Sequence, residues 1–131
     1  MAKTSAALVR GLVCLPLIAM KATTADKTDA AMARVPCKGR IWAIAPVYGL
    51  SAGDVVATDV DAQVQRGTTN VFSSAHGLID ASADTTTAPT LDEDQRAVAE
   101  GDILHLDLDL TGGTNPTLVG YGYMVMIEPT T

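Results

Sequence analysis

The sequence predicts an all-β protein, an antiparallel β-sandwich of about eight short strands with a jelly-roll-like arrangement. Charged residues make up only 18% of the chain, whereas surface helices would bring more Glu and Lys. Two segments alternate apolar and polar residues with the period of a half-buried strand. No long segment repeats its apolar residues with a helical period. A chain of 131 residues suits one domain, here residues 12–131, preceded by an N-terminal basic arm at residues 1–11.

The two alternating segments predict strands with one buried face each. Valine, threonine and alanine occupy every second position from 56 to 64, and Asp59 and Asp61 lie between them. Leucines occupy positions 104, 106, 108 and 110, with His105, Asp107 and Asp109 in between. Because side chains alternate across a strand, we expect the leucines in the core and the acids on the surface.

The other strands are expected from apolar runs that end at turn residues. Pro16 places the run at residues 12–21 at a sheet edge or a bulge, because proline cannot donate a ladder hydrogen bond. That run resembles a secretory leader, but we interpret it as a strand, and it is too short to span a bilayer. Residues 80–98 are irregular, with a short helical turn near 92–98. Further strands are expected at residues 31–37, 40–48 and 118–127, and residues 70–79 supply a strand pair or one bent strand.

Charge is distributed unevenly along the chain. Residues 1–40 hold seven basic and two acidic residues, a net +5, and residues 41–131 hold two basic and thirteen acidic residues, a net −11. An acidic body disfavours nucleic acid, whose binding needs basic clusters. The basic segment, including Lys3 and Arg10, either docks on an acidic partner surface or attracts the acidic part within one fold.

The residues do not predict a catalytic site, a cofactor or a bound metal. His105, Asp107 and Asp109 share one strand face, but neighbours on such a face are roughly 7 Å apart, too far for all three to bind one small ion. We therefore interpret them as a solvated outer face. His76 lacks a nucleophile motif nearby, and the common nucleotide, metal and hydrolase motifs are absent from the sequence.

The cysteines and the single tryptophan are assigned to the interior. Cys14 and Cys37 form neither a CxxC motif nor a disulfide framework, and two free, buried thiols are favoured over one bridge. Trp42 is predicted to be a core residue in an apolar strand. The last strand is apolar on both faces, so both faces should be covered, one by the core and the other by a neighbouring subunit.

Five segments follow one another in a familiar order. They are the Val35-Pro36-Cys37-Lys38-Gly39 turn before an apolar strand, a Thr/Ala/Pro-rich loop at residues 84–90, the Ala99-Glu100-Gly101-Asp102-Ile103-Leu104 segment, a Gly-Gly-Thr turn at residues 112–114, and an apolar last strand ending near Glu128-Pro129. Together they resemble the capsid decoration, or cement, proteins of tailed bacteriophages, which have a jelly-roll body. The resemblance covers residues 12–129.

The resemblance implies a non-enzymatic virion protein on the exterior of a phage head. Such a protein is made in the host cytoplasm and forms a homotrimer that bridges neighbouring major capsid proteins. Lys3 and Arg10 are then expected to contact the capsid, and Tyr121, Tyr123 and Met124 to lie near the threefold contact. No membrane partner is implied.

Two alternative functions remain at this point. One is another phage structural component, such as a head fibre base or a tail protein. The other is a secreted carbohydrate-binding β-sandwich, which an exposed aromatic platform, such as Tyr121 with Tyr123, or a calcium site would favour. An apolar seam in a trimer would favour a virion protein.

Overall fold

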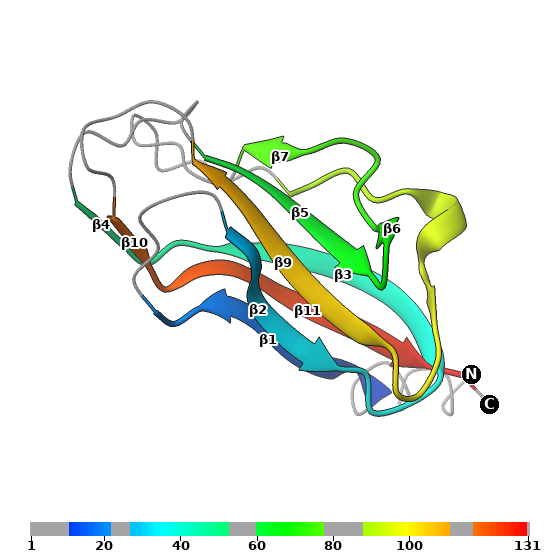
Figure 1. The fold of residues 1–131 in the computed structure, drawn as a ribbon. Coiled ribbons are helices and arrows are strands. Elements are labelled where there is room, and N and C mark those ends of the chain that lie inside the picture. Colours follow the sequence, from blue (N-terminus) through cyan, green and yellow to red (C-terminus); the bar gives the residue numbers. More distant parts are fainter. Residues whose placement is uncertain (1–10, 22–26, 53–59, 78–87, 111–116, 131) are drawn as a thin grey trace.

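A computed structural model describes residues 11–21, 27–52, 60–77, 88–110 and 117–130, which form eleven strands and one 3₁₀ helix (Figure 1). Sheet I contains β1 (Val13–Ala19), β11 (Tyr121–Pro129), β3 (Gly39–Val47) and β8 (Ala97–Val98), in that order. Sheet II contains β2 (Lys27–Arg34), β9 (Ile103–Leu110), β5 (Val60–Arg66) and β6 (Thr69–Asn70), and β7 (His76–Gly77) also pairs with β5. β4 (Leu50–Ala52) pairs with β10 (Thr117–Val119), and the helix η1 spans Glu93–Gln95.

The two sheets pack face to face, and every strand pair is antiparallel (Figure 1). Four of the pairs are nested along the chain: β1 pairs with β11, β2 with β9, β3 with β8, and β5 with β6. The pair of β4 with β10 crosses the second and third of these. The predicted all-β antiparallel sandwich is therefore confirmed.

The core lies between the sheets and follows the predicted alternation. Val60, Ala62 and Val64 of β5 are buried, and so are the leucines at 104, 106 and 108 of β9. Val60 is the first described residue of the predicted 56–64 strand, since residues 53–59 lie outside the described part. Sheet I supplies the opposite half of the core, chiefly Leu17, Ile41, Ile44, Tyr123, Val125 and Ile127.

The boundaries of other elements differ from the prediction. β2 begins at Lys27, four residues before the expected start at residue 31. Its first half is polar and joins the pairing with β9 at Lys27, on the far side of an irregularity in the register. Residues 70–79 contribute two short strands, β6 and β7, on β5. The expected helical turn is η1, where the Asp92 carboxylate accepts a hydrogen bond from the Asp94 amide at 3.0 Å. Residues 78–87 of the irregular stretch lie outside the described part.

β1 forms an edge of sheet I, as Pro16 predicted. Its backbone lies close to Gly122 of β11, where a Cβ atom would collide with the Leu17 carbonyl oxygen and lie 2.7 Å from Ile18 Cα. The lack of a side chain at Gly122 thus serves pairing within the chain. Both cysteines are free, as expected, but Cys14 is exposed on the outer side of β1 and Cys37 is only half-buried. The prediction that both thiols are buried was wrong, because Cys14 alternates with the core-facing residues of β1.

Candidate docking surface

Part of the outer side of sheet I is formed by apolar side chains, bordered by the charged pair Arg40 and Glu128. The register aligns three rows across β1, β11 and β3, and among the described residues none of these nine positions is charged. We call this surface, together with the neighbouring Trp42, the apolar face. Its rows are Cys14–Met126–Ala43, Pro16–Met124–Ala45 and Ile18–Gly122–Val47.

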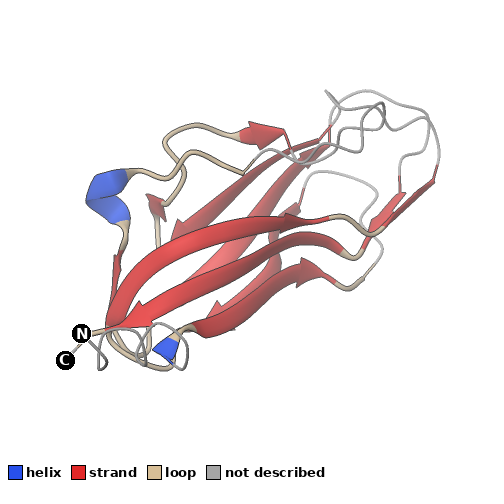
Figure 2. Ribbon diagram, turned by 180° about the vertical axis from the view of Figure 1, so that it is seen from behind, coloured by secondary structure: helices blue, strands red, loops and turns tan. Residues whose placement is uncertain are grey.

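The apolar face is accessible. Cys14 and Pro16 are exposed, and Met124 and Met126 are half-buried. In Figure 2, which looks onto sheet I, none of the described elements crosses in front of β1, β11 and β3. The last strand therefore has one face in the core and an apolar second face that the described part of the chain leaves uncovered.

Trp42 belongs to the apolar face and is 48% exposed, so its predicted place in the core was wrong. The cause is a bulge in β3. Ile41 pairs with Ile127 and Ala43 pairs with Met126, so Trp42 is an extra residue without a partner on β11. Ile41 stays buried, and the extra residue turns the indole outward.

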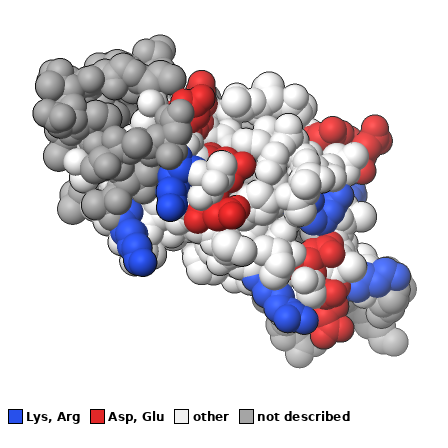
Figure 3. Space-filling model, in the orientation of Figure 1, with Lys and Arg blue, Asp and Glu red and all other residues white. Residues whose placement is uncertain are grey.

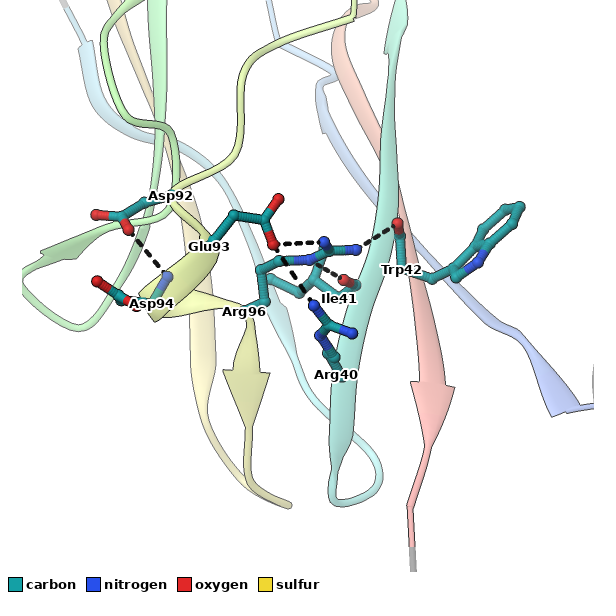
Figure 4. Close-up of polar contacts among 7 residues, drawn as sticks. All are labelled: Arg40, Ile41, Trp42, Asp92, Glu93, Asp94 and Arg96. Atoms are coloured by element: carbon teal, nitrogen blue, oxygen red, sulfur yellow. Dashed lines mark hydrogen bonds and ion pairs between the residues drawn. The ribbon is translucent and has the colours of Figure 1, made fainter.

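Arg96, just before β8, binds the backbone of this bulge (Figure 4). Its Nε donates to the Ile41 carbonyl oxygen at 2.8 Å, and one terminal nitrogen donates to the Trp42 carbonyl oxygen at 2.9 Å. The other terminal nitrogen pairs with Glu93 at 2.8 Å, and the Ile41 amide donates to the Arg96 carbonyl oxygen. We call these contacts of Arg96 the clamp. In Figure 4 the indole points away from Arg96, so the clamp lies on one side of β3 and the Trp42 side chain on the other.

The outer side of sheet II has the opposite character. It carries Asp61 and Gln63 of β5 and Asp107 and Asp109 of β9, and acidic side chains spread across the middle of the surface in Figure 3. A hollow of about 460 Å³ lies among them, with Lys27 of β2 on its rim. The sandwich therefore presents one broad face with an apolar surface and one charged broad face, the acidic face, with acidic side chains at its centre and basic ones around them.

His105 sits on this acidic side but is not simply solvated, because its side chain is only 14% exposed. Its Nδ1 lies 2.8 Å from Asp29 Oδ1 and 3.4 Å from Asp107 Oδ1, and its Nε2 lies 2.6 Å from the Gly67 carbonyl oxygen. The carboxylates beside the ring are thus those of Asp29 and Asp107, whereas alternation grouped His105 with Asp107 and Asp109 on a solvated face. No pattern in the sequence indicated Asp29, because a bulge in β2 brings it there.

The remaining predicted site residues fall in three places. Lys3 and Arg10 lie outside the described residues. Tyr121 and Tyr123 are in the core, 4% and 0% exposed, and the Tyr123 hydroxyl lies 2.6 Å from His76 Nδ1. Met124 alone of the three proposed threefold residues lies on the apolar face. The expected trimer stays a prediction, but the two tyrosine side chains are already occupied by packing within the chain.

Comparisons with protein-family models, with curated proteins and with solved structures found no match. Within the described residues, no helix has the length and apolar character needed to cross a membrane.

Proposed function

We propose that this protein is a non-enzymatic structural protein that attaches to a larger assembly by its apolar face, as a decoration protein on the outside of a phage head. The observation that supports the proposal is the contrast between the two broad faces. One carries the apolar face with the only tryptophan of the chain, and the other is charged, with acidic side chains at its centre. An exposed apolar surface of this kind is typical of an interaction site.

The size of the apolar face favours attachment in many copies. Three strands about 4.8 Å apart and three rows about 7 Å apart give roughly 300 Å². Burying that area of this chain contributes roughly 7 kcal/mol before the cost of association is subtracted. One copy would therefore bind weakly, whereas a symmetric oligomer on a repeating lattice gains affinity from linked contacts. A homotrimer seated on the major capsid protein meets this requirement.

Within the apolar face, Trp42 and Met124 are the proposed anchors. Tryptophan is enriched among residues that dominate binding energy, and a presented indole inserts into a partner pocket. Met124 occupies the middle row between Pro16 and Ala45. The N-terminal arm with Lys3 and Arg10 would add a second contact, and we expect removal of residues 1–10 to weaken binding.

The alternative functions make different use of the same surface. A fibre base or a tail protein would also dock by an apolar face, in fewer copies per virion. A carbohydrate-binding module needs a platform of exposed stacking rings, and the Tyr121 and Tyr123 side chains are buried, which leaves Trp42 as the exposed ring among the described residues. The copy number per virion separates the two virion proposals.

The test is co-sedimentation with undecorated phage heads. Replacing Trp42 and Met124 together by serine should lower affinity at least about tenfold, because a buried tryptophan anchor alone is typically worth 2 kcal/mol or more. In the unchanged protein, Trp42 fluorescence should shift to shorter wavelength on binding, since the indole leaves water.

The matched control is Asp109→Ser, an exposed substitution on the opposite face, which should bind as the unchanged protein does. If the double variant were folded and bound heads as tightly as the control, the apolar face would not be the docking surface. If no form bound, the decoration proposal would be wrong.

A further inference from the structure

The His105 ring has an oxygen atom at each of its two nitrogens. Nε2 hydrogen-bonds to the Gly67 carbonyl oxygen at 2.6 Å, which accepts only. Nδ1 lies between the carboxylates of Asp29 and Asp107, at 2.8 and 3.4 Å. Only the doubly protonated imidazolium can donate at both ends. If either proton is lost, a nitrogen lone pair faces an oxygen at close range.

The backbone around Asp29 is shaped to make this contact. β2 leaves its regular pairing with β9 between Lys27 and Ala31. Asp29 lies within this bulge with φ of +55°, a left-handed conformation that non-glycine residues adopt at a cost. Its amide donates to Asp107 Oδ1 at 3.0 Å, and its carboxylate reaches His105. The two contacts that Asp29 makes with β9 therefore offset the cost of its backbone conformation.

The same bulge forms one wall of the hollow on the acidic face. Lys27 and Thr28 line it from β2, opposite Asp61 and Gln63 of β5, and Asp107 and Asp109 of β9 lie between. Thr28 is the neighbour of Asp29 in the chain, and β2 is an edge strand, bordered by β9 alone. The position of this wall thus depends on how firmly Asp29 is held.

We propose that His105 is a proton-dependent latch: its imidazolium form fixes the Asp29 bulge of β2 to β9, and loss of the proton releases the β2 wall of the hollow. This regulation is separate from the proposed docking by the apolar face, because it concerns the opposite sheet.

The charges around the ring agree with this role. Burial opposes the charged form, but the Gly67 carbonyl, Asp107 and Asp29 outweigh it and raise the pKa of His105 above its ordinary value of 6.5. The laterally paired residues on β2 and β5, Met32 and Gln65, are uncharged.

Two arginines lie in the neighbouring rows of the sheet, where Arg66 pairs with Leu104 and Arg34 with Ile103. Both guanidinium groups are directed away from His105. The Arg34 guanidinium lies beside Gly101, and Arg66 donates to the carbonyl oxygens of Gln95 and Ala97.

A raised pKa fixes the sign of the effect. A histidine that holds its proton more tightly in the folded state stabilises that state at low pH, and this contribution is lost as the pH rises through the folded pKa. The latch is therefore closed at and below pH 6.5 and opens above the folded pKa of His105.

The experiment is a pH titration of the full ¹⁵N-labelled chain by NMR, in the presence of a chelator. We expect both His105 ring nitrogens to be protonated at pH 6.5, with a midpoint above 6.5. The Asp29 amide signal should titrate with the same midpoint. Above it, hydrogen exchange at Asp29 and Ala30, corrected for base catalysis, should accelerate by about tenfold or more, as for local opening. His76, the only other histidine, is the internal comparison.

Two variants make the test specific. Asp29→Asn keeps the shape but removes one charge, and should lower the midpoint of His105. Asp109→Asn, farther along the same strand face, should leave it unchanged. A midpoint at or below 6.5, an Asp29 amide that does not follow the ring, or equal midpoints in the two variants would each overturn the proposal. So would zinc, added without chelator at equimolar amount, replacing the Nδ1 proton at pH 6.5, since the cluster would then be a metal site.

Discussion

Replacing Leu106 by alanine is expected to lower the free energy of unfolding by about 2–5 kcal/mol. Leu106 is 0% exposed and lies in the centre of β9, paired with Ala31 of β2 on one side and Val64 of β5 on the other. Its side chain fills the middle of the sandwich, so truncation leaves a cavity that the flanking strands cannot close without losing their hydrogen-bonded register. Chemical denaturation monitored by circular dichroism measures the change.

Asp109→Ser on the same strand is the control, with an expected change of about 0.5 kcal/mol or less, as for exposed substitutions. Asp109 points outward, and its neighbours Leu108 and Leu110 point toward the core side. A strongly destabilised Asp109→Ser variant beside a stable Leu106→Ala variant would mean that β9 is inverted, with every side chain on the wrong face.

Replacing Arg96 by methionine is expected to destabilise the fold by about 2–4 kcal/mol, because hydrogen bonds to charged groups contribute about 1.5–3 kcal/mol each. The Arg96 side chain is only 16% exposed and binds the Ile41 and Trp42 carbonyl oxygens and Glu93. Methionine keeps much of the aliphatic packing but leaves both carbonyl groups without this donor. The bulge should then relax, and the fluorescence of Trp42 should change in the folded protein.

Arg40→Met is the matched control. Arg40 also pairs with Glu93, at 3.5 Å, but its side chain is 57% exposed, so the expected loss is within about 1 kcal/mol. Equal effects of the two substitutions would show that the backbone contacts of Arg96 contribute nothing. An unchanged tryptophan signal in folded Arg96→Met would show that the bulge persists without the clamp.

The parts of the fold that the sequence predicted are those set by local alternation. The leucines of β9 and the alternating residues of β5 indicate the buried face without reference to any partner strand, because one step along a strand reverses the face. Pro16 likewise indicated an edge strand by its missing amide proton. Turn residues then divided the chain into many short strands, and this pattern predicts a sandwich.

The candidate sites depend on contacts between distant segments, which alternation cannot predict. Trp42 faces outward because β3 has one more residue than β11 at that point, and the clamp comes from Arg96, 55 residues from Ile41. Asp29 reaches His105 only through a bulge whose register is set by β9. The apolar run around Trp42 therefore indicated a core residue, and the sequence analysis assigned no role to Asp29.

The location of Cys14 offers a chemical route to the surface proposed for docking. Cys14 is exposed in one row of the apolar face, whereas Cys37 is half-buried. Since a thiol reagent reaches an accessible cysteine first, a limiting amount of maleimide should modify Cys14 preferentially in the folded chain. A single alkylation would therefore both label this side of the protein and obstruct it, with no mutation and with the acidic side untouched.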